Sequence, residues 1–139
     1  MIICGFPGVG KSMMAKFDRA VDLESTPFEK DWVRYAKVAK HMHDSGYLVM
    51  VSTHKELLDC FEQMEVPYTV VVPRADDLET YVRRYEARGN SAEFVQKVVE
   101  NWDEWLRQIH SKPSVLKTMV ILPKDGCLKA WFDEVNNDY

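Results

Sequence analysis

The chain has 139 residues and a formal net charge of -4, with 22 acidic and 18 basic residues mixed along its length. This length is typical of one domain, 1–139, that builds a single hydrophobic core. The slightly acidic balance argues against a long nucleic-acid footprint and against binding to an anionic membrane surface. No apolar run is long enough to predict a membrane-spanning helix.

The number and spacing of the cysteines indicate the cellular compartment of the protein. Cys4, Cys60 and Cys127 are odd in number and far apart in the sequence, which is typical of reduced thiols rather than of a disulfide framework or a metal site. The N-terminal residues show no signal-peptide pattern. We therefore expect a cytoplasmic protein, in the cytoplasm of the host if a phage encodes it.

The first part of the chain predicts a phosphate-binding loop. Residues 5–12 read GFPGVGKS and fill every fixed position of the pattern G-x-x-x-x-G-K-[ST]. The apolar residues 1–4 suit a buried strand and residues 13–20 can form a helix, so the strand–loop–helix context is present. The alternative is a glycine-rich turn with an incidental Gly-Lys-Ser.

A loop of this kind turns successive backbone N–H groups toward an anion, and the following helix N-terminus adds partial positive charge. We expect Lys11 to reach the β- and γ-phosphates of ATP and to act in catalysis, and the Ser12 hydroxyl to bind Mg²⁺. The residues predicted to bind the nucleotide are Gly5, Pro7, Gly8, Val9, Gly10, Lys11, Ser12 and Met13.

The rest of the chain alternates between strand and helix patterns. The predicted strands are 1–4, 21–26, 47–51, 68–73 and 117–122, and the predicted helices are 13–20, 32–45, 55–64, 76–88, 92–110 and 128–135. This alternation predicts a three-layer α/β sandwich around a parallel sheet. Because ligands of such sheets bind at the carboxyl ends of the strands, the loop 5–12 and the residues after each later strand should share one edge.

With these residues assembled, the chain resembles small P-loop kinases of the nucleoside monophosphate kinase-like superfamily. More narrowly, it resembles a group of short phage and bacterial proteins described as adenylate kinase-like. The matching stretches are GFPGVGKS, DLES, VSTHKE, PYTVVVPR, YVRRYEARGN and ENWDEW. The resemblance implies a five-stranded parallel sheet of order 2-3-1-4-5 and phosphoryl transfer from ATP with Mg²⁺. The chain lacks the long lid insertion of adenylate kinases and their arginine-bearing adenosine-monophosphate motif, so the acceptor stays open.

Acidic and hydroxyl groups follow the second predicted strand. Asp22 and Glu24 are two residues apart, so both side chains can face the same side. We expect Asp22 to take a proton from an acceptor hydroxyl or to hold Mg²⁺ through water, and Glu24 and Ser25 to bind the acceptor. A solvated turn after an edge strand is the alternative.

The third predicted strand ends in Ser52-Thr53-His54, where many P-loop proteins carry a Walker B aspartate. Metal binding must then depend on Ser12, water and Asp22. His54 is expected either to contact the acceptor or to cap the following helix.

Arginines gather after the fourth predicted strand. Arg84 and Arg88 are one helical turn apart, as in a compact lid that closes on the transferring phosphate, and we expect them to be catalytic. Arg83 and Arg74 are expected to bind substrate. The alternative is a solvated helix face that pairs with neighbouring glutamates.

Two aromatic residues open the helix after the acidic strand end. Trp32 and Tyr35 could stack on a planar acceptor group, although aromatic residues at helical spacing are more often part of the core. Trp102 is expected to pack in the core. By the resemblance, residues 123–126 lie where similar kinases cradle adenine.

These features predict a P-loop kinase that transfers the γ-phosphate of ATP to a nucleotide or to a small hydroxylated acceptor. A 5′-hydroxyl polynucleotide kinase is one alternative. It would need a basic groove for the end of a nucleic acid, which the net charge of -4 does not indicate. A nucleotide-binding regulator without catalysis is the other. No membrane partner is expected.

Overall fold

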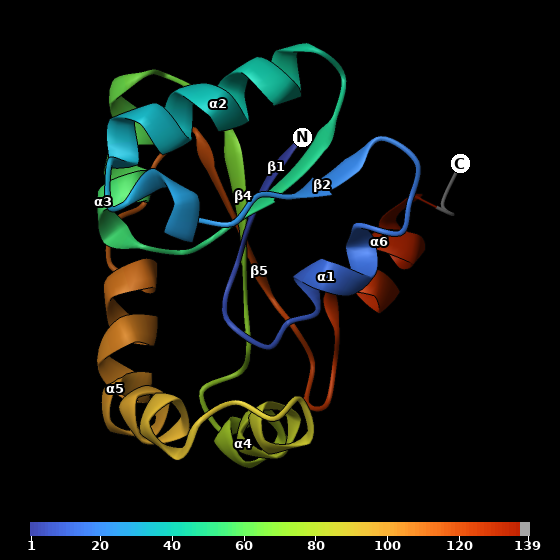
Figure 1. Cartoon of the computed structure of the whole chain (residues 1–139), viewed down its shortest axis with the longest axis vertical. Helices are drawn as coiled ribbons and strands as arrows, with labels where there is room; N and C mark the ends of the chain where they lie inside the picture. The colour runs from blue at the N-terminus through green and yellow to red at the C-terminus, as the bar shows by residue number, and fades with distance from the viewer. Residues whose placement is uncertain (137–139) are drawn as a thin grey trace.

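The structure, a computed structural model, describes residues 1–136. Within them five strands form one sheet: β1 (Ile2–Gly5), β2 (Ala20–Asp22), β3 (Leu48–Val51), β4 (Tyr68–Val72) and β5 (Lys117–Ile121). The helices are α1 (Lys11–Met14), the 3₁₀ helix η1 (Thr26–Phe28), α2 (Trp32–Asp44), α3 (Lys55–Gln63), α4 (Leu78–Ala87), α5 (Ala92–His110) and α6 (Leu128–Asn136) (Figure 1).

The sheet is parallel throughout and its strand order is β2-β3-β1-β4-β5, which confirms the predicted topology. β1 lies at the centre, where Cys4 is in register with Val51 of β3 on one side and Val70 of β4 on the other. Every residue of β1 is buried. This burial explains the continuous apolar runs, because a parallel strand covered on both faces has no solvent side.

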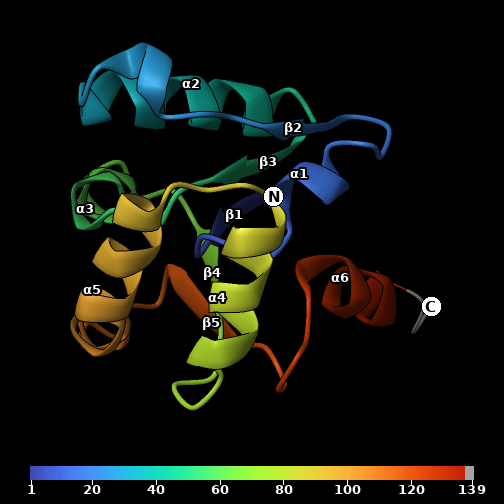
Figure 2. The same ribbon diagram turned by 60° about the horizontal axis from the view of Figure 1, so that its bottom comes forward.

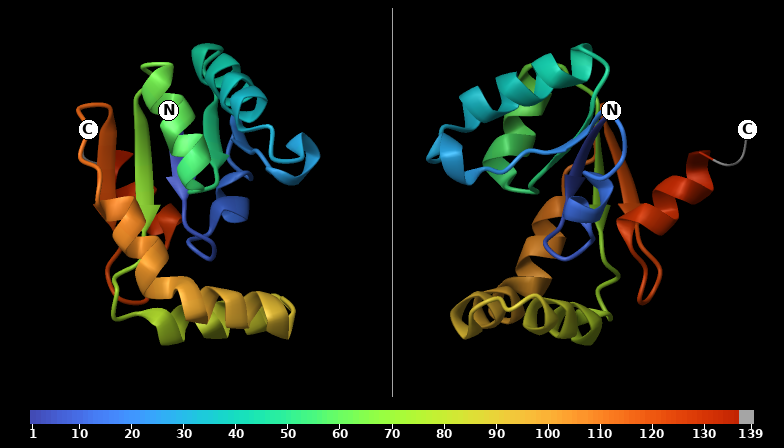
Figure 3. Two further views of the ribbon diagram at one scale, coloured as in Figure 1. Left: turned by 90° about the vertical axis from the view of Figure 1, so that its left-hand side faces the viewer. Right: turned by 45° about the vertical axis from the view of Figure 1, so that its right-hand side comes forward.

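Helices cover both faces of the sheet, as the prediction of a three-layer sandwich requires. α2 and α3 lie on one face, and α1 and α6 lie on the other (Figure 3, right). α4 and α5 pack side by side beyond the carboxyl ends of the strands (Figures 2 and 3). This helical pair therefore lies over the edge where the predicted site residues gather.

The predicted helix over 13–20 is wrong. α1 ends at Met14, Arg19 has a left-handed φ of 61°, and Ala20 already begins β2. Of the apolar residues that suggested a helix, Met14 is buried but Met13 and Phe17 are exposed. A longer helix would gain little from packing, and packing rather than propensity sustains most helices in proteins.

The second strand is also shorter than predicted. The sequence pattern of 21–26 suggested one strand, but β2 ends at Asp22 and η1 begins at Thr26. The last link to the sheet is the hydrogen bond from the Leu23 N–H to the Met50 carbonyl (2.8 Å). Glu24 and Ser25 consequently lie in a turn beyond the sheet edge.

Aromatic packing attaches the loop after β1 to the overlying helices. Phe6 is buried and meets Trp102 of α5 edge-on at 5.3 Å between ring centroids. The Trp102 indole N–H donates to the Ala75 carbonyl at 2.9 Å. Trp102 is therefore a core residue, as predicted, and it ties α5 to both β1 and the start of α4.

Within residues 1–136, each helix is either too short or too polar to cross a lipid bilayer. The three cysteines are free, and Cys4 is buried in the central strand. Burial raises the pKa of the Cys4 thiol well above its ordinary value.

Candidate functional site

The loop 5–12 depends on two glycines with left-handed backbone. Gly8 has φ 93° and Gly10 has φ 103°, a region that L residues with a side chain seldom adopt. Gly8 also lies against α4, because a Cβ there would come 2.9 Å from ring atoms of both Tyr81 and Tyr85. A Cβ on Gly10 would meet no atom within 4 Å. The loop is thus closed against α4 at Gly8 and open at Gly10.

Three successive carbonyls of the loop have partners outside it. The Tyr85 hydroxyl donates to the Pro7 carbonyl at 2.6 Å, and the Leu128 N–H donates to the Val9 carbonyl at 2.8 Å. Between them, Arg84 Nη1 donates to the Gly8 carbonyl at 3.0 Å. These contacts turn the carbonyl dipoles toward α4 and α6 and away from the open side of the loop.

The N–H groups of the loop are disposed differently. The Val9 N–H donates to the Phe6 carbonyl at 3.1 Å and closes a turn. Within residues 1–136, the N–H groups of Gly8 and Gly10 donate to no backbone carbonyl. Pro7 has no N–H and Val9 uses its own, so these two predicted nucleotide-binding residues support the loop instead of offering donors. The available donors fit an anion.

Lys11 folds back over the start of the loop. A Cβ on Gly5 would come 2.9 Å from Cγ and from Cδ of Lys11, so the lysine stem crosses the backbone at Gly5. Burial lowers the pKa of Lys11, while the charges of Asp22 and Glu24 act to raise it and that of Arg88 to lower it. The structure therefore brings the predicted lysine, acids and one arginine within electrostatic reach of one another.

The acids at the end of β2 differ in exposure. Burial raises the pKa of Asp22; Lys11 opposes that shift and Glu24 adds to it. Glu24 is exposed, and Ser25 is half-buried, with its carbonyl accepting from the Phe28 N–H at 3.0 Å. Asp22 is consequently more easily protonated than an ordinary aspartate. Its interaction with the Lys11 charge also distinguishes it from the residue of a solvated turn.

The end of β3 contributes an imidazole that stacks on Trp32. The rings of His54 and Trp32 are 4.6 Å apart at an angle of 33°, and His54 Nδ1 lies 2.8 Å from Ser52 Oγ. Burial lowers the pKa of His54, and the positive charge of Lys11 adds to that shift. His54 is the N-cap residue of α3, as one alternative predicted; its backbone carbonyl accepts from the Leu58 N–H at 3.1 Å, but its side chain makes no capping hydrogen bond.

The prediction that Tyr35 binds the acceptor is wrong. Its side chain is fully buried, its hydroxyl donates to the Leu23 carbonyl, and its ring lies 4.9 Å from that of Phe28. No face of this ring is open to a ligand, so Tyr35 supports the acidic strand end from within the core. Trp32, which is half-buried, keeps its place at the edge of the site.

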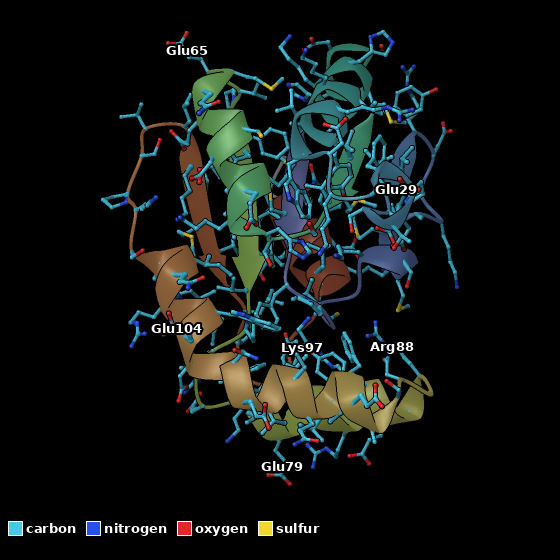
Figure 4. The ribbon with its side chains drawn as sticks, turned by 60° about the vertical axis from the view of Figure 1, so that its left-hand side comes forward. Glu29, Glu65, Glu79, Arg88, Lys97 and Glu104 are labelled. Atoms are coloured by element: carbon cyan, nitrogen blue, oxygen red, sulfur yellow. The ribbon has the colours of Figure 1, made fainter. Side chains whose placement is uncertain are left out.

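The arginines separate into two groups. Arg83 pairs with Glu79 at 3.3 Å on the exposed face of α4, and in Figure 4 Glu79 points away from the strands. Arg74 makes a two-pronged pair with Asp76, at 3.0 and 2.8 Å. For Arg83 the solvated-face alternative holds, and Arg74 is likewise engaged by a neighbouring carboxylate.

Arg84 and Arg88 both lie toward the loop but in different surroundings. Arg84 uses both terminal nitrogens on backbone carbonyls, with Nη2 donating to Gly126 at 2.7 Å. Arg88 is exposed, its guanidinium lies 5.5 Å from the ring centre of Tyr85, and its Nε donates to the Asn90 side chain. Arg88 is therefore the arginine placed to meet an anion, and Arg84 supports the loop.

Two residues of this region were missed from the sequence. Tyr85 lies within the predicted helix 76–88 with no role predicted for it, although its hydroxyl holds the loop. Lys97 of α5 lies on the side of the helical pair that faces the strands (Figure 4), and its charge acts on His54. Neither carries a sequence signal, because both depend on how α4 and α5 cross the sheet edge.

The donors available to a metal are few. Within residues 1–136 there is no group of three or more His, Cys, Asp or Glu side chains arranged for a metal ion. Ser12, which lies exposed in α1 beside Met13, and Asp22 offer a hydroxyl and a carboxylate. Such oxygen donors fit Mg²⁺, which usually keeps several of its waters and takes one or two protein ligands.

No protein-family model matches the chain, and no curated protein matches it.

Proposed function

We propose that the chain is a Mg²⁺-dependent phosphotransferase that moves the γ-phosphate of ATP to a nucleotide or a small hydroxylated acceptor. The observation that carries the proposal is the arrangement around Lys11. Its stem lies over Gly5 beside the free N–H groups of the loop, and its charge interacts with Asp22, Glu24 and Arg88. Donor groups for a polyphosphate and groups suited to an acceptor thus share one edge of the sheet.

On the donor side, the N–H groups of Gly8 and Gly10 bind phosphate oxygens, and Lys11 neutralises the β- and γ-phosphates. Ser12, and Asp22 through water, are the residues that would hold Mg²⁺. The metal ion supplies positive charge that offsets the charge of the polyphosphate. Since phosphoryl transfer needs little covalent help from a protein, alignment and charge account for most of the catalysis.

On the acceptor side, an oxygen of the acceptor forms a bond to the γ-phosphorus while the bond from that phosphorus to the bridging oxygen breaks. The electron pair of the broken bond stays with ADP. For a hydroxyl acceptor, the proton passes to the Asp22 carboxylate. Arg88 stabilises charge on the transferring group, and the Trp32–His54 pair offers a planar surface for the acceptor.

The test is ADP formation from ATP and Mg²⁺ with a panel of nucleoside monophosphates, nucleosides, small polyols and oligonucleotide 5′-ends. One acceptor class should stimulate turnover, and Lys11→Ala should abolish it. Lys40→Ala is the matched control, because Lys40 pairs with Asp44 near the end of α2, just before β3 begins and therefore at the opposite end of the sheet from the loop. ATP binding without turnover on any acceptor would favour the regulator and contradict the proposal.

A further inference from the structure

Helix α4 holds the loop 5–12 by its backbone. The Tyr85 hydroxyl donates a hydrogen bond to the Pro7 carbonyl at 2.6 Å, and Arg84 Nη1 donates to the Gly8 carbonyl at 3.0 Å. The Tyr85 ring also fills the space beside Gly8, where a Cβ would come within 2.9 Å of it. The helix therefore meets the loop by two hydrogen bonds and by direct packing.

The segment between β5 and α6 fixes the same helix. Asp77, just before α4, is buried; it accepts from the Thr80 hydroxyl at 2.6 Å and from the Asp125 N–H at 2.8 Å. Arg84 donates to the Gly126 carbonyl at 2.7 Å and lies 4.7 Å from the ring centre of Tyr81. The Arg84 guanidinium is thus held on three sides and bridges two loops that are far apart in the sequence.

The peptides on either side of Gly8 have fewer steric barriers to rotation than peptides between residues with side chains. Glycine adopts left-handed and right-handed backbone with similar ease, so the Pro7–Gly8 and Gly8–Val9 peptides can turn over at low steric cost. Such a turn would exchange an N–H for a carbonyl on the open side of the loop. A carbonyl there would repel a phosphate, whereas preorganised N–H groups bind it without reorganisation.

We propose that Tyr85 and Arg84 are positioning residues that hold the Pro7 and Gly8 carbonyls away from the anion-binding side of the loop, and that Arg84 acts through the loop instead of touching the transferring phosphate. This proposal deepens the proposed function and rests on it, since the anion in question is the nucleotide polyphosphate. It assigns the two arginines of α4 different roles: Arg88 faces the ligand and Arg84 supports the backbone that binds it.

Tyr85→Phe is the test variant, because it removes only the hydroxyl and keeps the ring. Tyr68→Phe is the matched control. The Tyr68 hydroxyl is also buried and donates to Glu62 at 2.5 Å, but Tyr68 begins β4 at the opposite end of the sheet. Hydrogen exchange of the amides of residues 8–12 is measured without ligand, and ATP affinity is measured by calorimetry.

In Tyr85→Phe, the amides of residues 8–12 should exchange faster and ATP should bind about 3- to 10-fold more weakly, as expected for one lost hydrogen bond. Tyr68→Phe should change neither quantity. Unchanged exchange and unchanged affinity in Tyr85→Phe would overturn the proposal. If the wild-type chain binds no ATP but Tyr85→Phe still exchanges faster, the loop support stands and the proposed function fails.

Arg84→Ala separates support of the loop from contact with the γ-phosphate. A positioning residue affects the whole phosphate site, so ADP and ATP should lose affinity by the same factor. A residue that contacts the γ-phosphate would weaken ATP alone. Selective loss of ATP affinity would overturn the role assigned to Arg84, and Arg88→Ala in the same assay supplies the comparison.

Discussion

The Lys11 side chain lies where a Cβ on Gly5 would be. A Cβ on Gly5 would lie 2.9 Å from Cγ and from Cδ of the lysine, much closer than carbon atoms pack in proteins. The first glycine of the loop is therefore required by the path of the lysine stem and not by its own backbone angles, since its φ is not left-handed.

Gly5→Ala should displace the Lys11 side chain and reduce turnover by about 10- to 100-fold, because small misplacements of a catalytic group are costly. The added methyl would also press on Val9 Cγ2 at 2.9 Å, so some loss of stability is expected. A double-mutant cycle with Lys11→Met isolates the effect when ATP affinity is measured, because replacing the lysine already abolishes turnover. If the two losses simply add, Gly5 acts independently of Lys11 and the interpretation is wrong.

The two exposed arginines of α4 should behave differently. Arg88→Ala should lower turnover by about 100-fold, as for the loss of one group that stabilises charge in the transition state. Arg83→Ala should leave turnover and the unfolding midpoint unchanged, because its pair with Glu79 is exposed and such pairs contribute little. Steady-state kinetics and thermal unfolding of both variants provide the measurement. Equal losses would mean that α4 presents a different face to the site.

Substitutions of the two aromatic residues of α2 should have different effects, one on stability and the other on acceptor binding. Tyr35→Ala should cost about 3–5 kcal/mol of stability, in the range for removing a buried aromatic side chain, because Tyr35 is fully buried. Trp32→Ala should mainly raise the KM of the acceptor, since Trp32 lies at the site edge against His54. Denaturant unfolding and acceptor kinetics test the pair, and a Trp32 variant with wild-type acceptor KM would remove that residue from the site.

Local patterns predicted the sheet well and its helical surroundings less well. The apolar runs that became β1, β3 and β4 are buried on both faces, so their composition alone determined their place. The prediction of a helix over 13–20 failed because Met13 and Phe17, although apolar, stay exposed and therefore add little burial that would hold a longer helix. The same limit applied to Tyr85: a hydroxyl that reaches the Pro7 carbonyl, 78 residues away in the chain, has no local signature.

The roles of Arg84 and Arg88 could not be told apart from their spacing in the sequence. The spacing of Arg84 and Arg88 correctly placed both on the side of the loop, but spacing is the same for a side chain that meets a ligand and for one that meets a backbone carbonyl. Only the position of the loop between β5 and α6 distinguishes the two, because Gly126 supplies the second acceptor for Arg84.

Asp77 should make the free energy of unfolding fall at low pH. Burial alone would raise the pKa of this carboxyl, but hydrogen bonds from Thr80 and from the Asp125 N–H, with the charge of Arg84, bring it below its ordinary value of 3.8. A lowered folded-state pKa contributes stability that is present above about pH 4 and is lost as the pH falls through the folded value. Asp77→Asn should therefore cost about 1–3 kcal/mol at pH 7, and the difference from wild type should shrink toward pH 3. Urea unfolding across pH 3–7 measures it, with exposed Asp103→Asn as the control. A pH-independent difference would mean that the Asp77 charge is not what holds α4 to the β5–α6 loop.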